Sequence, residues 1–205
     1  TPVTGLLLAC FSLWSVQSSK GATFYWDNDA TGVNNVLTGG GLGGLGTWNT
    51  TGSNWWNGSS LSGLSAWNNG GNDTAVFTGT AGAITLGTGV TVGGLQFNTT
   101  GYSLGAAANT NAITFGTNSN IVLNNVAAAT INGSLAGSGN VNLTGGVFGG
   151  VTAGTLTLSG TGTSLTGYTG TTTINGGTLA LGNGGSISGP IVNNSTLLLN
   201  NTAGL

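Results

Sequence analysis

Few side chains in this sequence are able to do acid–base or covalent chemistry. The 205 residues contain no histidine, arginine or glutamate, and the only charged side chains are Lys20, Asp27, Asp29 and Asp73. An enzyme needs a proton carrier or an activated nucleophile, and the many serines and threonines have no base to activate them. A glycosidase would need two carboxylates that face one cleft. We therefore predict no catalytic residues and a protein that is not an enzyme.

The first two aspartates open the segment Asp27–Gly32, which reads DNDATG. It is similar to the front half of a calcium-binding loop with the pattern D-x-D-x-x-G. However, the third ligand position is Thr31, and the sequence has no glutamate to supply the bidentate closing ligand. Asp, Asn and Gly are also ordinary turn residues, and Asp73 in GGNDTAVF fits a turn before a strand. We therefore predict neither a metal site nor a cofactor.

The composition excludes several classes of partner. Charged residues make up 2% of the chain, against about 25% in an ordinary protein, and glycine occurs 42 times. The sequence has no basic patch to bind phosphates, so nucleic acid and anionic lipid are excluded as partners. Disordered chains have high charge and few β-branched residues, whereas Thr, Val, Leu and Ile are abundant here. This composition predicts many short strands joined by tight turns.

Residues 1–22 are interpreted as a signal peptide that is truncated at its start. The apolar run Gly5–Val16 is shorter than the roughly 20 residues of a membrane-spanning helix. Small polar residues follow it and suit cleavage after Ser18 or Ala22. A lipoprotein signal ending at Cys10 is a second interpretation, although the apolar run continues past that residue. An uncleaved anchor is the third, and under all three the protein leaves the cytoplasm.

Residues 23–77 stand out by their aromatic side chains. Five of the six tryptophans fall here, namely Trp26, Trp48, Trp55, Trp56 and Trp67. We expect this segment to cap the open end of a repeat array, because uncovered strand edges would pair with other chains. The alternative is a platform for sugar stacking, since exposed indole faces bind pyranose rings. Neighbours on a strand face opposite sides, so Trp55 and Trp56 are the candidate glycan-binding residues.

Residues 78–205 consist of strand-like runs that start about every 8–12 residues, without a helical period. A β-sandwich or barrel and a parallel β-solenoid are the competing architectures. Repeated asparagines at strand ends favour the solenoid, because stacked asparagines form hydrogen-bonded ladders; the candidates include Asn98, Asn124, Asn132, Asn175 and Asn194. The scarcity of charge also favours it, since successive coils lie only about 4.8 Å apart. We expect coils of roughly 20–25 residues and an array that is incomplete at its C-terminus.

The clearest repeat lies at residues 154–182, GTLTLSGTGTSLTGYTGTTTINGGTLALG. Its three alternating runs, TLTL, TTTI and TLAL, are each one short strand long and are separated by Gly-rich turns. This stretch closely resembles the autotransporter-associated β-strand repeat, which is found in passenger regions of bacterial autotransporters. The matching blocks are Gly154–Gly160, Tyr168–Ile174 and Gly176–Gly182. The aromatic segment from YWDNDATG to AWNNGGNDTAVF also looks like the beginning of such proteins.

The resemblance implies an all-β fold, a right-handed parallel β-helix with an aromatic-rich N-terminal cap, secreted to the surface of a Gram-negative bacterium. It implies a non-catalytic scaffold for adhesion or surface display. The partners would be a host or neighbouring cell surface, matrix or polysaccharide, and a region downstream of this chain would provide any outer-membrane association. Carbohydrate binding through the tryptophans is the alternative function. Ice binding through Thr-x-Thr pairs such as Thr155 and Thr157 is a weaker rival, because the pairs do not recur at one spacing.

Overall fold

The computed structural model describes residues 21–59, 63–106, 110–124, 127–145, 154–160 and 167–200. Most of the predicted signal peptide, including Cys10, lies outside these residues, as does the middle of the best-matching repeat. The protein is nearly all β and 2% helical; the short 3-10 helix η1 spans Gly32–Asn34. Among the described residues, no helix has the length and apolar character needed to cross a bilayer.

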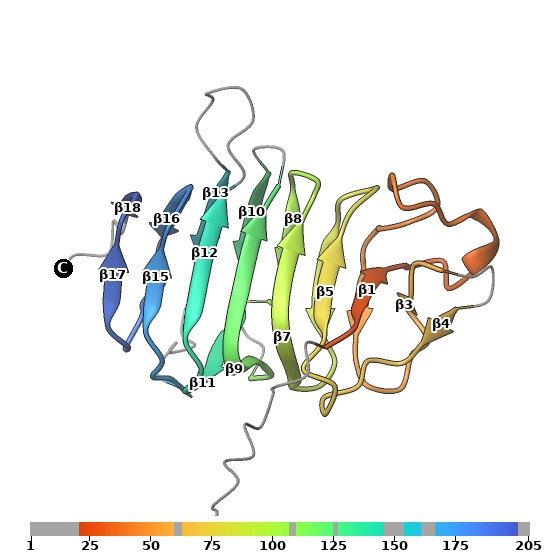
Figure 1. The fold of residues 1–205 in the computed structure, drawn as a ribbon, viewed down its shortest axis with the longest axis horizontal. Helices are drawn as coiled ribbons and strands as arrows, with labels where there is room; N and C mark the ends of the chain where they lie inside the picture. The colour runs from red at the N-terminus through yellow and green to blue at the C-terminus, as the bar shows by residue number, and fades with distance from the viewer. Residues whose placement is uncertain are drawn as a thin grey trace, which may run out of the picture.

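Two sheets form the walls of an elongated body (Figure 1). The eleven-stranded sheet has the order β17 (Ile191–Asn193), β15 (Thr172–Ile174), β12 (Val141–Gly145), β9 (Ala112–Leu123), β7 (Val90–Phe97), β5 (Thr74–Phe77), β1 (Thr23–Trp26), β3 (Trp55–Trp56) and β4 (Leu64–Ser65), with β11 (Ser134–Gly137) paired to β9 and β14 (Gly167–Tyr168) paired to β11. The seven-stranded sheet has the order β18 (Thr196–Leu199), β16 (Thr178–Leu181), β13 (Thr155–Leu158), β10 (Ala128–Ile131), β8 (Tyr102–Leu104), β6 (Ala83–Leu86) and β2 (Gly46–Trp48).

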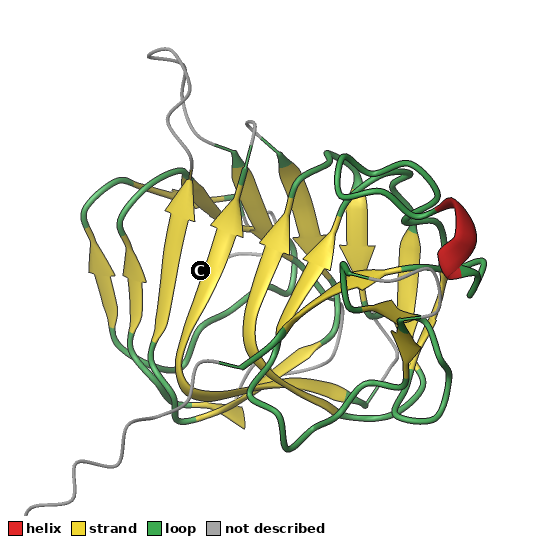
Figure 2. Ribbon diagram, turned by 45° about the vertical axis from the view of Figure 1, so that its right-hand side comes forward, coloured by secondary structure: helices red, strands yellow, loops and turns green. Residues whose placement is uncertain are grey.

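Parallel pairing between successive coils identifies the body as a β-solenoid. Along the first sheet, Leu95 of β7 pairs with Ile121 of β9, which in turn pairs with Leu143 of β12. Among the described strands, antiparallel pairing occurs only where β3 meets β1 and β4. Figure 2 shows the strands of each wall running side by side in the same direction. The predicted solenoid is confirmed, and the β-sandwich alternative is wrong.

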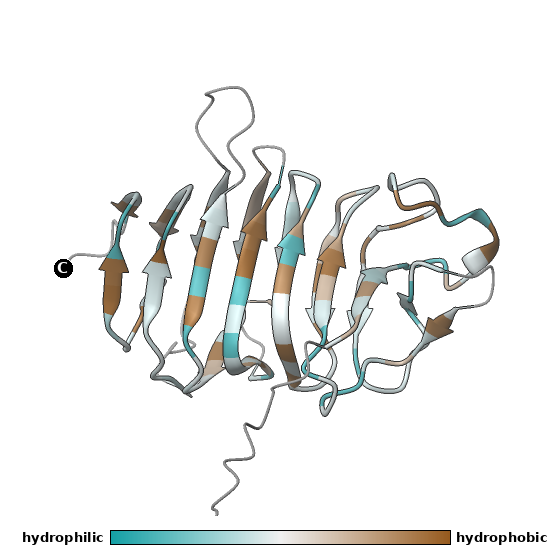
Figure 3. Ribbon diagram, in the orientation of Figure 1, coloured by the Kyte–Doolittle hydropathy of each residue, from teal (hydrophilic) through white to brown (hydrophobic). Residues whose placement is uncertain are grey.

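The alternation of threonine and leucine decides which side chains fill the interior. In β13 the side chains of Leu156 and Leu158 are buried, while Thr155 and Thr157 are partly exposed on the outside. The next coil repeats the register, since Leu156 pairs with Leu179. Because side chains alternate along a strand, each coil adds one layer of leucine, isoleucine or valine to a continuous core. This alternation is seen as bands along the strands in Figure 3.

The corners between strands, rather than the strands themselves, set the length of each coil. Neighbouring coils are offset by 18 residues at Gly177 and Ser195 but by 31 at Asn140 and Thr171. The expected range of coil lengths, roughly 20–25 residues, is therefore too narrow. Loops outside the walls do not contribute to stacking, so their length is free to vary while the strands keep their register.

The predicted asparagine ladders are confirmed at several strand ends. Asn124 Nδ2 donates to Asn98 Oδ1 at 2.9 Å, and Asn194 Nδ2 donates to Asn175 Oδ1 at 2.9 Å. A third contact joins Ser159 Oγ to Asn132 Oδ1 at 2.7 Å. Each bond connects two coils, so these side chains extend the backbone ladder around the corners of the solenoid.

The aromatic N-terminal segment is continuous with the solenoid. β1 pairs in parallel with β5, and β2 pairs in parallel with β6, so both sheets already begin within this segment. The strands β3 and β4 then add an antiparallel edge to the end of the first sheet. The end of the core is filled by aromatic side chains, as the cap hypothesis requires.

Candidate functional site

A cluster of indole rings closes the N-terminal end of the core. The ring centroids of Trp55 lie 4.6 Å from those of Trp67 and 4.8 Å from those of Trp48. The cluster continues into the solenoid through Phe77, which stacks on Phe97 of the next coil at 5.1 Å. Rings of this size bury a large apolar area, so the cluster acts as an aromatic plug.

The structure does not expose the two tryptophans that were candidates for glycan binding. Trp55 is 1% exposed and Trp56 is 5% exposed. The two rings do lie on opposite sides of the short strand β3, but both sides are covered. Trp55 enters the aromatic plug, and Trp56 packs against Tyr25 with ring centroids 5.7 Å apart. Neither ring offers a free face for a sugar, so the carbohydrate-binding alternative is not supported.

Hydrogen bonding within the aromatic plug is incomplete. Trp26 Nε1 donates to the carbonyl oxygen of Gly44, and Trp67 Nε1 donates to that of Thr91, both at 2.9 Å. In the described part of the chain, the buried Nε1 groups of Trp48 and Trp55 have no acceptor. Two buried N–H groups without acceptors are a cost, which the packing of the rings must outweigh.

Two carboxylates and two amides meet in the loop that follows β1. Asp27 Oδ1 accepts from the backbone N–H of Ala30 at 3.1 Å, and Asp27 Oδ2 accepts from Asn35 Nδ2 at 2.7 Å. Asp29 Oδ1 accepts from the N–H of Thr31 at 2.9 Å, and its Oδ2 accepts from Asn34 Nδ2 at 3.0 Å. We call Asp27–Asn35 the acidic loop.

The two carboxyl groups of the acidic loop differ in burial and in the direction of their pKa shifts. Asp27 is completely buried, and burial raises the pKa of its carboxyl to about 6, with the neighbouring Asp29 acting in the same direction. The amide of Asn34 lowers the pKa of the more exposed Asp29. A buried charge is normally paired or bound to a cation, yet the described residues include no Lys, Arg or His.

The third aspartate serves a separate turn. Asp73 Oδ1 accepts from the backbone N–H of Ala22 at 2.7 Å, just before β5, which agrees with the predicted turn role. Among the described residues, no group of three or more His, Cys, Asp or Glu side chains comes together. The arrangement brings Asp27 and Asp29 together and leaves Asp73 apart, so it offers no nucleophile with an activating base.

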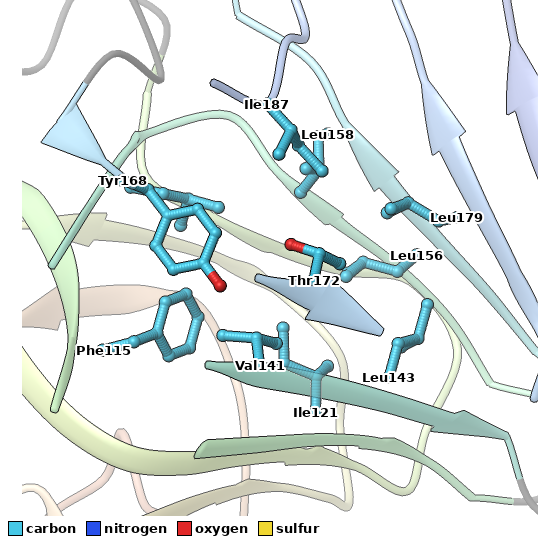
Figure 4. A pocket seen from close by; sticks show the side chains of 11 residues that line it. Phe115, Ile121, Val141, Leu143, Leu156, Leu158, Tyr168, Thr172, Leu179 and Ile187 are labelled. Carbon is cyan, nitrogen blue, oxygen red and sulfur yellow. The ribbon is translucent and has the colours of Figure 1, made fainter. Parts of the chain in front are cut away.

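An internal void lies between the two walls in the C-terminal half (Figure 4). Its volume is about 20 Å³, and its lining is almost wholly apolar, with Phe115, Tyr168 and Val141 among the residues around it. Tyr168 donates its hydroxyl proton to the carbonyl oxygen of Thr171 at 3.1 Å. Ligand pockets usually measure about 300–1,000 Å³. This void is a small packing gap and not a binding pocket.

The outer surface of the first sheet carries a row of polar, uncharged side chains that sequence reasoning did not identify. Thr74, Asn120, Asn142 and Thr173 occupy successive in-register positions, with Gly94 between the first two. We call this row the outer polar ladder. A hollow of about 560 Å³ lies at its N-terminal end, lined by Gly21, Gly93 and polar side chains that include Thr74 and Asn120. In the sequence, these residues are the polar members of alternating polar and apolar pairs. The register that aligns them from coil to coil is not visible there.

Comparison with known proteins agrees with this architecture. The chain is 36% identical over 203 residues to the protein described as "Adhesin BmaC autotransporter" from Brucella suis biovar 1 (strain 1330). The chain is similar to an autotransporter adhesin. The match covers 98% of this chain and 5% of the length of that protein. No family model and no solved structure matches the chain. The resemblance predicted from the repeat is confirmed by this match together with the β-solenoid, which is consistent with the β-helix of an autotransporter passenger.

Proposed function

We propose that this chain is a non-enzymatic segment of a bacterial surface adhesin, and that the outer polar ladder is its contact surface. The observation that carries the proposal is the distribution of side chains over the solenoid. Apolar groups fill the core, the aspartates belong to turns, and the first sheet presents amides and hydroxyls in register. The similarity to an autotransporter adhesin supports the same role.

The chemistry of the outer polar ladder indicates how contact would be made. Asn120 and Asn142 carry one amide each, able to donate and accept hydrogen bonds, and Thr173 adds a hydroxyl. Without charge, such a surface gains little from long-range electrostatic steering. Adhesion would then depend on many short-range contacts repeated from coil to coil, on a host or neighbouring cell surface or its matrix. The protein would be displayed outside a Gram-negative cell.

An adhesion assay with the purified chain tests this proposal. Beads coated with the chain are counted on epithelial cells and on immobilised matrix proteins, against beads coated with albumin. Asn142→Arg places a bulky charge on the outer polar ladder and should reduce bead binding at least fivefold. Thr157→Arg on the outward side of β13 is the matched control and should retain binding. The proposal fails if beads coated with the unmodified chain bind no better than albumin beads, or if both variants lose binding equally while circular dichroism shows both folded.

A further inference from the structure

The acidic loop holds a negative charge that the described chain does not neutralise. Asp27 is 0% exposed, and its nearest charged neighbour is another carboxylate, Asp29. In the residues that the structure describes there is no cationic side chain of any kind. The N–H of Ala30 and the amide of Asn35 donate to this carboxylate, and a bound proton or a bound cation would offset the remaining cost of burying its charge.

A second observation identifies a further oxygen beside this carboxylate. Asn35 is 7% exposed, and its Oδ1 is buried without a hydrogen-bond partner in the described part of the chain. The same amide reaches the carboxylate, since Asn35 Nδ2 lies 2.7 Å from Asp27 Oδ2. Turned toward Asp27, this oxygen would either bind a cation in the loop or accept a hydrogen bond from a protonated Asp27, and a calcium titration separates the two outcomes.

We propose that the acidic loop binds one calcium ion through side-chain oxygens of Asp27, Asp29 and Asn35. Rotation of the Asn35 amide by about 180° exchanges its nitrogen and oxygen positions. After this rotation the Asn35 oxygen would take the present place of Nδ2, which lies 2.7 Å from Asp27 Oδ2. That spacing suits two ligands of one calcium ion, whose oxygen ligands lie at roughly 2.3–2.6 Å from the metal.

The kind of donor atom selects the metal. All of the available side-chain ligands are carboxylate or amide oxygens, and the loop has no histidine or cysteine to favour zinc or copper. Asn34 forms a second amide–carboxylate pair, 3.0 Å from Asp29 Oδ2, and supplies one more oxygen by the same rotation. The missing glutamate, which argued against a metal in the sequence, is replaced by asparagines that lie beyond the D-x-D-x-x-G pattern. Water completes the coordination shell.

Calcium binding to the complete chain tests the proposal directly. After dialysis against EDTA and removal of the chelator, calorimetric titration with CaCl₂ should show one site, with Kd roughly 10⁻⁴ to 10⁻³ M, as in extracellular calcium modules. Terbium is a second probe, because the indole of Trp26 is adjacent to Asp27 in the chain and should sensitise terbium emission that calcium displaces. The melting temperature should rise with calcium concentration.

Two matched variants assign the binding to the acidic loop. Asp29→Asn removes a carboxylate from an exposed position and should weaken calcium binding at least tenfold. Asp73→Asn removes the carboxylate that caps Ala22 in a different turn and should leave the affinity unchanged. Circular dichroism of both variants checks that they fold, and the titration of the unmodified chain does not depend on either.

Three results would overturn the proposal. The first is an absence of calcium-dependent heat and of any melting shift up to about 10 mM CaCl₂, which is the outcome expected if Asp27 simply holds a proton. The second is equal loss of affinity in Asp29→Asn and Asp73→Asn. The third is full affinity in Asp29→Asn.

Discussion

Asn98 and Asn124 are 26 residues apart in the chain, and their side chains meet at 2.9 Å across two neighbouring coils. Asn98 Oδ1 also accepts from Gln96 Nε2 at 2.9 Å, so one amide oxygen receives two donors. The backbone continues the same connection, because the N–H of Asn124 donates to the carbonyl oxygen of Phe97. Side chain and backbone therefore fix the register of β7 on β9 at the same corner.

Removing the shared acceptor should weaken this corner. Asn98→Ala leaves Asn124 Nδ2 and Gln96 Nε2 without their partner, and a typical hydrogen bond contributes about 1 kcal/mol. We expect the free energy of unfolding, measured by urea titration, to fall by about 1–2 kcal/mol. Asn118→Ala is the control, since Asn118 is exposed near the hollow, and it should change stability by less than about 0.5 kcal/mol. Equal effects of the two substitutions would contradict a role for the ladder.

Two glycines of the same region should respond differently to alanine. A Cβ at Gly93 would overlap the backbone carbonyl oxygen of Asn72, whereas a Cβ at Gly89 would have its nearest neighbour, Ala112 O, at 3.7 Å. Gly93→Ala should therefore lower the free energy of unfolding by about 1–3 kcal/mol. Gly89→Ala should be neutral or should raise it by up to about 1 kcal/mol, because alanine restricts the unfolded chain. Urea titration of both variants measures the difference, and a harmless Gly93→Ala would show that the approach of Asn72 is not rigid.

The aromatic plug should be the least tolerant part of the N-terminal segment. Trp55→Ala removes a ring that contacts Trp67 at 4.6 Å and Trp48 at 4.8 Å. Emptying such a site should lower the free energy of unfolding by about 3–5 kcal/mol. Leu45→Ala, at a side chain that is 69% exposed, should change it by less than about 0.5 kcal/mol. Thermal unfolding followed by circular dichroism compares the two, and a small loss in Trp55→Ala would argue against a stabilising plug.

Stability should decline at alkaline pH because of a buried phenol. Tyr102 donates its hydroxyl proton to the carbonyl oxygen of Thr78 at 2.6 Å, and burial raises its pKa well above the usual value of about 10. The neutral form is therefore favoured in the folded state, so its contribution is complete below about pH 10 and falls as pH rises further.

Urea midpoints at pH 8 and pH 11 measure this decline. Tyr102→Phe should reduce the difference between the two pH values, although it also lowers stability at pH 8 by removing the hydrogen bond. The remaining loss of stability at alkaline pH would come from Tyr168, because burial also raises the pKa of that phenol. An identical decline in Tyr102→Phe and in the unmodified chain would rule out Tyr102 as the source.

The sequence predicted which side chains fill the core better than it predicted how side chains are arranged on the surface. Alternation of Thr and Leu at residues 154–158 identified which side chains enter the core, and terminal asparagines indicated ladders that the structure contains. The alternative of glycan binding needed an exposed ring at Trp55 or Trp56, but opposite sides of a strand are both buried when another ring, here Tyr25, covers the outer one. The acidic loop was interpreted as a turn, and its aspartates do accept from backbone N–H groups as turn residues do, but no local pattern indicated that Asn34 and Asn35 would meet them.

By itself, the sequence determined that the chain is built of short strands with one apolar face each, and that it contains no histidine, arginine or glutamate. Both properties are local, because residue type and period two are visible along the chain. The tertiary structure decided the register between coils, and with it the outer polar ladder, the depth of the aromatic plug and the convergence of Asp27 with Asn35. These depend on which residues become neighbours after corners of unequal length, from offsets of 18 to 31 residues. No local pattern specifies such offsets, since they are selected by the packing of whole coils on one another.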